Sequence, residues 1–109
     1  MTASDLFHVA LAEDWAAAEV VGEYTVSTRG RTLAEEGFIH CSFAEQLDAT
    51  AARFYADVDD AVVLRIEAER LSSPVVVEDL YGTGEEFPHV YGPIPVGAVV
   101  EVRPLRSPG

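Results

Sequence analysis

The sequence contains no lysine and only one cysteine, and these two features exclude several kinds of chemistry. Without lysine, the protein can form neither a lysine Schiff base nor the lysine-dependent phosphate loop found in many nucleotide-binding proteins. Because Cys41 stands alone, an internal disulfide and a zinc site built from several thiolates are both excluded. No apolar run reaches the roughly 18–20 residues that a membrane-spanning helix needs, so we expect no membrane association.

Positive charge is also scarce. Seven arginines stand against 19 aspartates and glutamates, which gives a formal net charge of −12. Because so acidic a surface repels a phosphate backbone, we expect no binding to nucleic acid, although an arginine pocket for one small anion remains compatible with the composition. The segment Met1–Asp5 carries neither a basic residue nor an apolar secretion segment, which predicts a cytoplasmic protein.

The length and the pattern of apolar residues predict one α+β domain. A chain of 109 residues is long enough for one core and too short for two, so we assign residues 1–109 to a single domain with its core at about 6–105. Short strands and two main helices that do not alternate strictly are typical of the α+β class. Strands are expected at residues 6–10, 24–27, 37–42, 62–67, 75–78 and 98–102, and the main helices at 13–21 and 43–56.

The segment Gly37–Ser42 is predicted to organise the rest of the chain. It has the pattern of a short buried strand that brings His40 to a strand end and then turns into a helix. Ser42 and Glu45 match the capping-box pattern, so we expect the helix to begin at Ser42. Helical spacing predicts an apolar inner face made of Leu47, Ala51, Phe54 and Val58, and an outer face made of Glu45, Gln46, Asp48, Arg53 and Asp57.

Two later segments carry turn and proline signals. Residues 81–86 form the most flexible-looking loop of the chain, and such a loop can act as a lid over a site or be a plain surface loop. Residues 87–95 contain three prolines, which is too many for a central strand because proline cannot donate to a strand ladder. We therefore expect this segment at a sheet edge.

The three histidines, His8, His40 and His89, each lie in or beside a predicted strand among apolar and aromatic neighbours. Each is compatible with a hydrogen-bonded structural role, but their similar settings favour one shared site. Their spacing lacks the close pair usual in zinc sites, so we predict no metal. Cys41 follows His40 on a strand and therefore points to the opposite face, so His40 is not expected to activate its thiol.

Four further residues are candidates for ligand binding. Arg29 lies in a glycine-containing turn and can clamp a phosphate or carboxylate, and Glu78 ends an apolar strand where a carboxylate can enter a pocket. Tyr91 has the amphipathic character suited to stacking on a ring, and the Ser42 hydroxyl can contact a ligand as well as cap a helix. A solvated arginine, a helix cap and a core tyrosine are the structural alternatives.

Several motifs resemble those of a family of short bacterial and plant proteins known as a domain of unknown function. The similarity runs from about residue 6 to residue 105, almost the whole chain, and its last two motifs are the most specific. The motifs are Leu6-Phe7-His8, Trp15-x-x-Ala18, Gly22-x-Tyr24, the stretch GFIHCS at residues 37–42 and the stretch FPHVYGPIP at residues 87–95.

This resemblance implies the ADP-ribosyltransferase-like fold, in which a split, mostly antiparallel sheet holds a nicotinamide-dinucleotide cleft between its halves. It implies that His8 lies on the first strand and contacts a ribose hydroxyl, and that residues 38–42 form the strand facing it. His8 is followed here by Val9 and Ala10, where those transferases carry glycine and then serine or threonine. No residue is assigned to the late catalytic glutamate of the transferases.

These observations lead to one functional hypothesis and two alternatives. The hypothesis is a small enzyme that binds NAD, a related ribonucleotide or an ADP-ribose compound and catalyses transfer or hydrolysis at a ribose carbon or phosphate of a small molecule. His40 and His89 are its catalytic candidates, and His8, Ser42, Tyr91, Arg29 and Glu78 are its substrate-binding candidates. The alternatives are a non-catalytic module that binds a small anionic metabolite and an adaptor protein whose histidines are structural.

The charge balance makes a direct prediction. The protein should not retard duplex DNA or structured RNA in a gel at about 0.15 M salt, because binding there depends on cations that neutralise phosphates. Micromolar binding that weakens as salt rises would contradict the small-molecule hypothesis.

Overall fold

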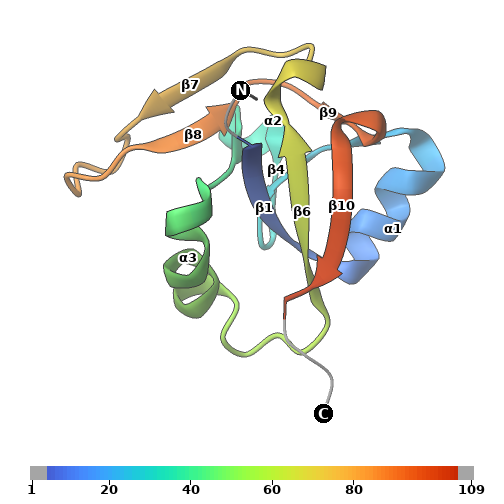
Figure 1. Ribbon diagram of the computed structural model, residues 1–109, viewed down its shortest axis with the longest axis horizontal. Helices are drawn as coiled ribbons and strands as arrows, with labels where there is room; N and C mark the ends of the chain where they lie inside the picture. Colours follow the sequence, from blue (N-terminus) through green and yellow to red (C-terminus); the bar gives the residue numbers. More distant parts are fainter. Residues whose placement is uncertain (1–4, 106–109) are drawn as a thin grey trace.

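The computed structural model describes residues 5–105, which form a single domain of mostly antiparallel sheets and few helices. The α+β prediction is confirmed. Figure 1 shows a central sheet with α1 on one side and α3 on the other, and a β7–β8 hairpin that extends above α3. None of the helices in residues 5–105 is long and apolar enough to cross a membrane.

The central sheet has the strand order β1-β6-β10, with β1 at Asp5–Leu11, β6 at Ala61–Glu67 and β10 at Val99–Pro104. Both pairings are antiparallel. Strand β6 lies in the middle and has no exposed residue, because α3 covers one face of the sheet and α1 and the second sheet cover the other.

The second sheet has the order β5-β8-β7, with β5 at Ile39–His40, β8 at Phe87–Val90 and β7 at Val75–Glu78. The proline-rich segment therefore supplies the middle strand, and the expectation that it lies at a sheet edge is wrong. The Cys41 N–H donates to the Pro88 carbonyl at 3.0 Å, so Pro88 lies opposite Cys41. Proline has no N–H to donate in return, but Cys41 lies just beyond the end of β5. The missing hydrogen bond thus lies outside the ladder.

The two sheets meet at a backbone bridge between Phe7 and Ser42. The Phe7 N–H donates to the Ser42 carbonyl at 2.8 Å, and the Ser42 N–H donates to the Phe7 carbonyl at 2.7 Å. Residues 39–42 therefore pair first with β8 and then with β1. This short segment joins the two sheets.

The helix after this segment begins later than predicted, and the expected Ser42 cap is wrong. A 3₁₀ turn, η1 (Ala44–Gln46), precedes α3 (Leu47–Phe54). The Ser42 backbone is paired with β1, and its buried hydroxyl donates to Thr50 Oγ1 at 3.2 Å instead of capping a helix. The backbone N–H that opens the turn, that of Phe43, donates to Gln46 Oε1 at 3.0 Å.

The side chains of two residues in this helical region point the opposite way from the prediction. Gln46 is 8% exposed and Phe54 is 46% exposed. Gln46 lies in the 3₁₀ turn, whose helical phase differs from that of an α-helix, and Phe54 is the last residue of α3. Leu47 and Ala51 are buried as predicted.

The remaining elements are short. Helix α1 is closed by Gly22, whose φ of 97° is the left-handed conformation that favours glycine, and α2 is capped by the reciprocal Thr32–Glu35 capping box. In chain order, the remaining elements are α1 (Ala12–Val21), β2 (Glu23–Tyr24), β3 (Val26–Thr28), β4 (Arg31–Thr32), α2 (Leu33–Glu36), η2 (Ala68–Arg70), β9 (Ile94–Pro95) and η3 (Val96–Ala98). Strand β2 pairs with β9, and β3 pairs with β4.

Gln46 is the side chain on which the start of α3 most depends. Its amide accepts from the Phe43 N–H and also donates to the Glu86 carbonyl at 2.7 Å, so it ties the turn to the β7–β8 loop. We expect Gln46→Ala to lower the free energy of unfolding by about 1–3 kcal/mol, because two partly buried backbone groups lose the buried side chain that pairs with them. Urea titration measures this. Glu45→Ala on the exposed side of the same turn is the control, and equal effects in the two variants would contradict the assignment.

Candidate functional site

One face of the second sheet carries a group of aromatic rings around His40. Phe38 and His40 come from the β5 side, and Phe87, His89 and Tyr91 come from β8 and its end, each two residues apart and so on one face. The ring centroids of His40 and His89 are 5.3 Å apart, and that of Phe38 lies 4.2 Å from His89. The opposite face of the strands points into the core, where Cys41 is buried as predicted.

A hydrogen-bonded chain runs across the three strands from Glu78 through His89 to His40. His89 Nδ1 lies 2.9 Å from Glu78 Oε2, and His40 Nδ1 lies 3.2 Å from His89 Nε2. Tyr91 donates its hydroxyl proton to the same Glu78 oxygen. The hydrogen bonds from Tyr91 and His89 lower the pKa of the Glu78 carboxyl.

The hydrogen bonds of the chain constrain where its protons lie. An ionised carboxylate only accepts, so His89 Nδ1 carries the proton that Glu78 receives. With a single proton on His89, its Nε2 is an acceptor, and His40 Nδ1–H donates to it. This leaves the Nε2 nitrogen of His40 without a proton.

His40 is neutral at pH 7. Burial, and after it the proximity of His89 and of His8, lowers the pKa of His40 to about 4. His40 is nevertheless the partly exposed histidine of the three, whereas His8 is 3% exposed and His89 is fully buried. Only His40 can therefore present an unprotonated nitrogen to a ligand in this arrangement.

His8 has both ring nitrogens occupied by protein groups. Its Nδ1–H donates to the His40 carbonyl at 2.6 Å, and the Tyr24 hydroxyl donates to its Nε2 at 2.9 Å. Burial lowers the pKa of His8 to about 4, and burial also raises the pKa of the Tyr24 phenol. His8 therefore contacts the backbone of His40 and leaves no nitrogen for a ligand.

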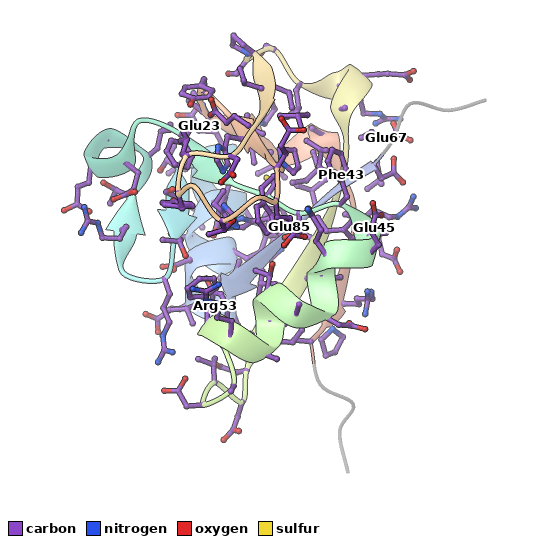
Figure 2. All side chains as sticks on the ribbon, turned by 90° about the vertical axis from the view of Figure 1, so that its left-hand side faces the viewer. Glu23, Phe43, Glu45, Arg53, Glu67 and Glu85 are labelled. Atoms are coloured by element: carbon purple, nitrogen blue, oxygen red, sulfur yellow. The ribbon has the colours of Figure 1, made fainter. Side chains whose placement is uncertain are left out.

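A cleft of about 590 Å³ lies beside His40. Figure 2 shows the β7–β8 loop, which carries Glu85, over the helix α3, with Arg53 toward the far end of that helix. Strand β3 closes the third side. The lining residues are Ser27, Thr28, Glu36, His40, Ala49, Thr50, Arg53, Phe54, Tyr81, Thr83, Glu85 and Phe87.

A crevice of about 10 Å³ adjoins the cleft on the side of β1. Its lining combines apolar and polar residues: Phe7, His8, Val9, Thr28, His40, Ser42, Thr50, Phe54 and Tyr55. A space of this size holds about one water molecule. His40, Thr28 and Thr50 line both spaces, so the crevice opens on the part of the cleft nearest the histidine.

The structure brings some of the predicted site residues together and leaves others apart. His40, His89, Glu78 and Tyr91 form the hydrogen-bonded chain. Ser42 lies in the small crevice. Arg29 is not among the residues that line the cleft: its guanidinium binds Asp57 through two hydrogen bonds, at 2.6 and 3.0 Å, and donates to the Phe54 carbonyl at 3.2 Å.

Sequence reasoning missed the arginine that does line the cleft. Arg53 is exposed, as the helical pattern predicted, and it also lines the cleft. It lines the cleft because the β7–β8 hairpin overhangs α3, and the helical pattern contains no signal for that long-range contact. Within residues 5–105, no group of three or more His, Cys, Asp and Glu side chains is arranged to hold a metal ion.

The lowered pKa values of His8 and His40 predict a loss of stability between pH 6.5 and 5. Both imidazoles stay neutral in the folded state down to about pH 4, whereas an unfolded histidine takes up a proton near pH 6.5. The unfolded state then binds more protons, so the free energy of unfolding falls as the pH falls. We expect a loss of about 2 kcal/mol from His8 between pH 7 and 5, and less from the partly exposed His40.

Urea titrations at pH 7, 6 and 5 measure this loss. Carboxylates contribute little in this window because their ordinary pKa values lie near 4. An unfolding free energy that stays constant from pH 7 to 5 would contradict the assignment of neutral, buried imidazoles.

Comparison with known proteins agrees with this fold. The crystal structure of CC0527 from Caulobacter crescentus has a TM-score of 0.82 and 30% identity, over 97% of this chain and 90% of that chain. A crystal structure of a double mutant of the same protein gives 0.82 at 29% identity over the same shares, and its solution NMR structure gives 0.78 at 30% identity over 96% and 87%. No curated protein matches. A family model described as "Protein of unknown function (DUF952)" matches residues 9–102, so the chain belongs to the DUF952 family.

Proposed function

We propose that the protein is a small enzyme that binds NAD, a related ribonucleotide or an ADP-ribose compound in the cleft and catalyses transfer or hydrolysis at a ribose carbon or phosphate. The observation that carries this proposal is the hydrogen-bonded chain from Glu78 through His89 to His40 Nδ1, which leaves the other nitrogen of His40, Nε2, for a ligand in the cleft. A base oriented by a second group, which is itself oriented by a carboxylate, is a recurrent catalytic arrangement.

In this proposal, His40 acts as the general base. Its Nε2 takes the proton of a substrate hydroxyl or of a water molecule, and its Nδ1 passes a proton to His89. The Glu78 carboxylate stabilises the positive charge that forms on His89, at the 2.9 Å contact between them. The low pKa of His40, about 4, keeps the base free of a proton at pH 7.

The size and lining of the cleft support a nucleotide-sized ligand. Its volume of about 590 Å³ lies within the roughly 300–1,000 Å³ typical of small-molecule sites. Three aromatic side chains line it, Phe54 and Tyr81 being well exposed, and such rings stack on a base or on nicotinamide. Hydroxyl groups of Thr28 and Thr50 supply partners for ribose oxygens.

We also propose that the fold is ADP-ribosyltransferase-like. The support is the division into two three-stranded sheets, with residues 38–42 between them and a histidine on the first strand. The role of that histidine changes in this proposal. His8 cannot contact a ribose hydroxyl while its nitrogens bind the His40 carbonyl and the Tyr24 hydroxyl, so we assign it the positioning of His40.

A ligand-detected screen with NAD, ADP-ribose and nucleotides, followed by a turnover assay on each hit, tests the proposal. Turnover supports the enzyme. Binding without turnover supports the metabolite-binding module, and the absence of binding supports the adaptor protein with structural histidines.

For the substrate found in that screen, we expect His40→Gln to lower kcat by about 10²–10⁴-fold, the usual contribution of a general base. Glu78→Gln should lower kcat less and should shift the acidic limb of the kcat–pH profile, because His40 and His89 lose the carboxylate that stabilises their protonated form. Arg103→Gln on β10 is the control, since Arg103 is exposed and does not line the cleft. A His40→Gln variant with the wild-type kcat would contradict the assignment.

A further inference from the structure

The strongest unexplained feature of the cleft is a cation without an acidic partner. Arg53 forms no ion pair with any residue of the described range, and its guanidinium lies over the Phe54 ring, 5.3 Å from the centroid. Four other arginines each pair with a carboxylate: Arg29, Arg31, Arg65 and Arg70. In a protein without lysine and with a net charge of −12, an unpaired arginine at a cleft fits an incoming anion.

A second feature points to the same end of the cleft. Ser27 is 1% exposed and lines the cleft, and its hydroxyl oxygen has no hydrogen-bond partner among residues 5–105. The hydrogen bond from Arg29 to the Phe54 carbonyl holds the end of β3 against the end of α3. Ser27 and Thr28 therefore lie near Arg53. A phosphate or carboxylate oxygen bound there supplies the partner that the Ser27 hydroxyl lacks, after a rotation of that side chain.

The other end of the cleft is acidic. Gln46 donates to Glu85 Oε2 at 3.1 Å and to the Glu86 carbonyl at 2.7 Å, which holds the β7–β8 loop at the start of α3. The second oxygen of the Glu85 carboxylate meets no donor in the described part of the chain, so it can accept one from a ligand. Figure 2 shows Glu85 apart from Arg53, which lies toward the far end of α3.

The helix sets the distance between these ends. Gln46 and Arg53 are seven residues apart, which corresponds to about 10 Å along the axis at 1.5 Å per residue. Thr50 lies midway and lines the crevice together with His40. The proposed base therefore faces the middle of a ligand whose two ends contact Arg53 and Glu85.

From this arrangement we infer that the cleft takes a ribonucleoside monophosphate whose base carries an amino group, in preference to a dinucleotide. This inference rests on the proposed function and specifies its substrate class. The single phosphate binds Arg53 and Ser27, and the amino group donates to Glu85. A pyrophosphate is disfavoured, because the lining contains one unpaired cation and the carboxylate of Glu85, while its other carboxylate, Glu36, is paired with Arg31.

Isothermal titration with AMP, adenosine, IMP and NAD tests the inference. The wild type should bind AMP at least about tenfold more tightly than adenosine or NAD, the scale expected for a charge-assisted contact. Arg53→Gln should abolish the advantage of AMP over adenosine, and Glu85→Gln should abolish the advantage of AMP over IMP. Arg103→Gln, which changes an exposed arginine outside the cleft, should leave all four affinities unchanged.

Inorganic phosphate gives an independent measurement that needs no variant. It should compete with AMP and should not compete with adenosine. The inference is overturned if NAD binds as tightly as AMP, if Arg53→Gln retains the AMP affinity, or if the wild type binds none of the four probes.

Failure of the inference is distinguishable from failure of the proposed function. Selective binding of AMP without turnover of any nucleotide would overturn the enzyme and leave the substrate class standing. Turnover of NAD without any preference for AMP would support the enzyme and overturn the inferred substrate class.

Discussion

The structure depends on the double pairing of residues 39–42. Ile39 and His40 pair with β8, and Ser42 then pairs with Phe7 of β1, so one short segment holds the two sheets together. The hydrogen bond from His8 to the His40 carbonyl adds a side-chain contact at the same place. Because the backbone on both sides of His40 is fixed by different sheets, its side chain has little freedom to turn away from the cleft.

The same constraint explains why the histidines differ in role. His8 and His89 are buried, and both ring nitrogens of each form hydrogen bonds within the protein. His40 lies at the end of the shortest strand of its sheet and keeps one nitrogen unprotonated beside the cleft. The hydrogen bond with buried His89 thus determines the tautomer of partly exposed His40. In many sites, the partner of one ring nitrogen determines the state of the other in this way.

Local signals in the sequence predicted much of this fold. The strand of β1, the helix α1 ending at Gly22 and the strand of β7 follow from periodicity and turn chemistry. The errors concern pairing over long range. The segment with Pro88 was expected at an edge, because nothing in the local sequence shows that the N–H it lacks lies opposite Cys41, beyond the end of β5. The Ser42 cap was expected because the local sequence carries no sign of the pairing between Ser42 and Phe7.

The candidate site shows the same division. His40, His89, Glu78 and Tyr91 stood out as residue types, and their grouping on one sheet face follows from strand alternation. Arg53 and Gln46 did not, because their importance comes from a hairpin that crosses over α3. Charged and amide groups on a helix reveal such contacts only once the tertiary structure is known.

The central claim is that Glu78 and His89 hold His40 as a neutral imidazole with its proton on Nδ1 and its Nε2 free. Two-bond ¹H–¹⁵N NMR spectra of ¹⁵N-labelled protein at pH 7 test it directly, because protonated and unprotonated ring nitrogens resonate far apart. We expect the His40 signals to show a protonated Nδ1 and an unprotonated Nε2 in the wild type. In Glu78→Gln we expect a mixture of tautomers. A His40 ring that is protonated on Nε2, or on both nitrogens, at pH 7 would contradict the account.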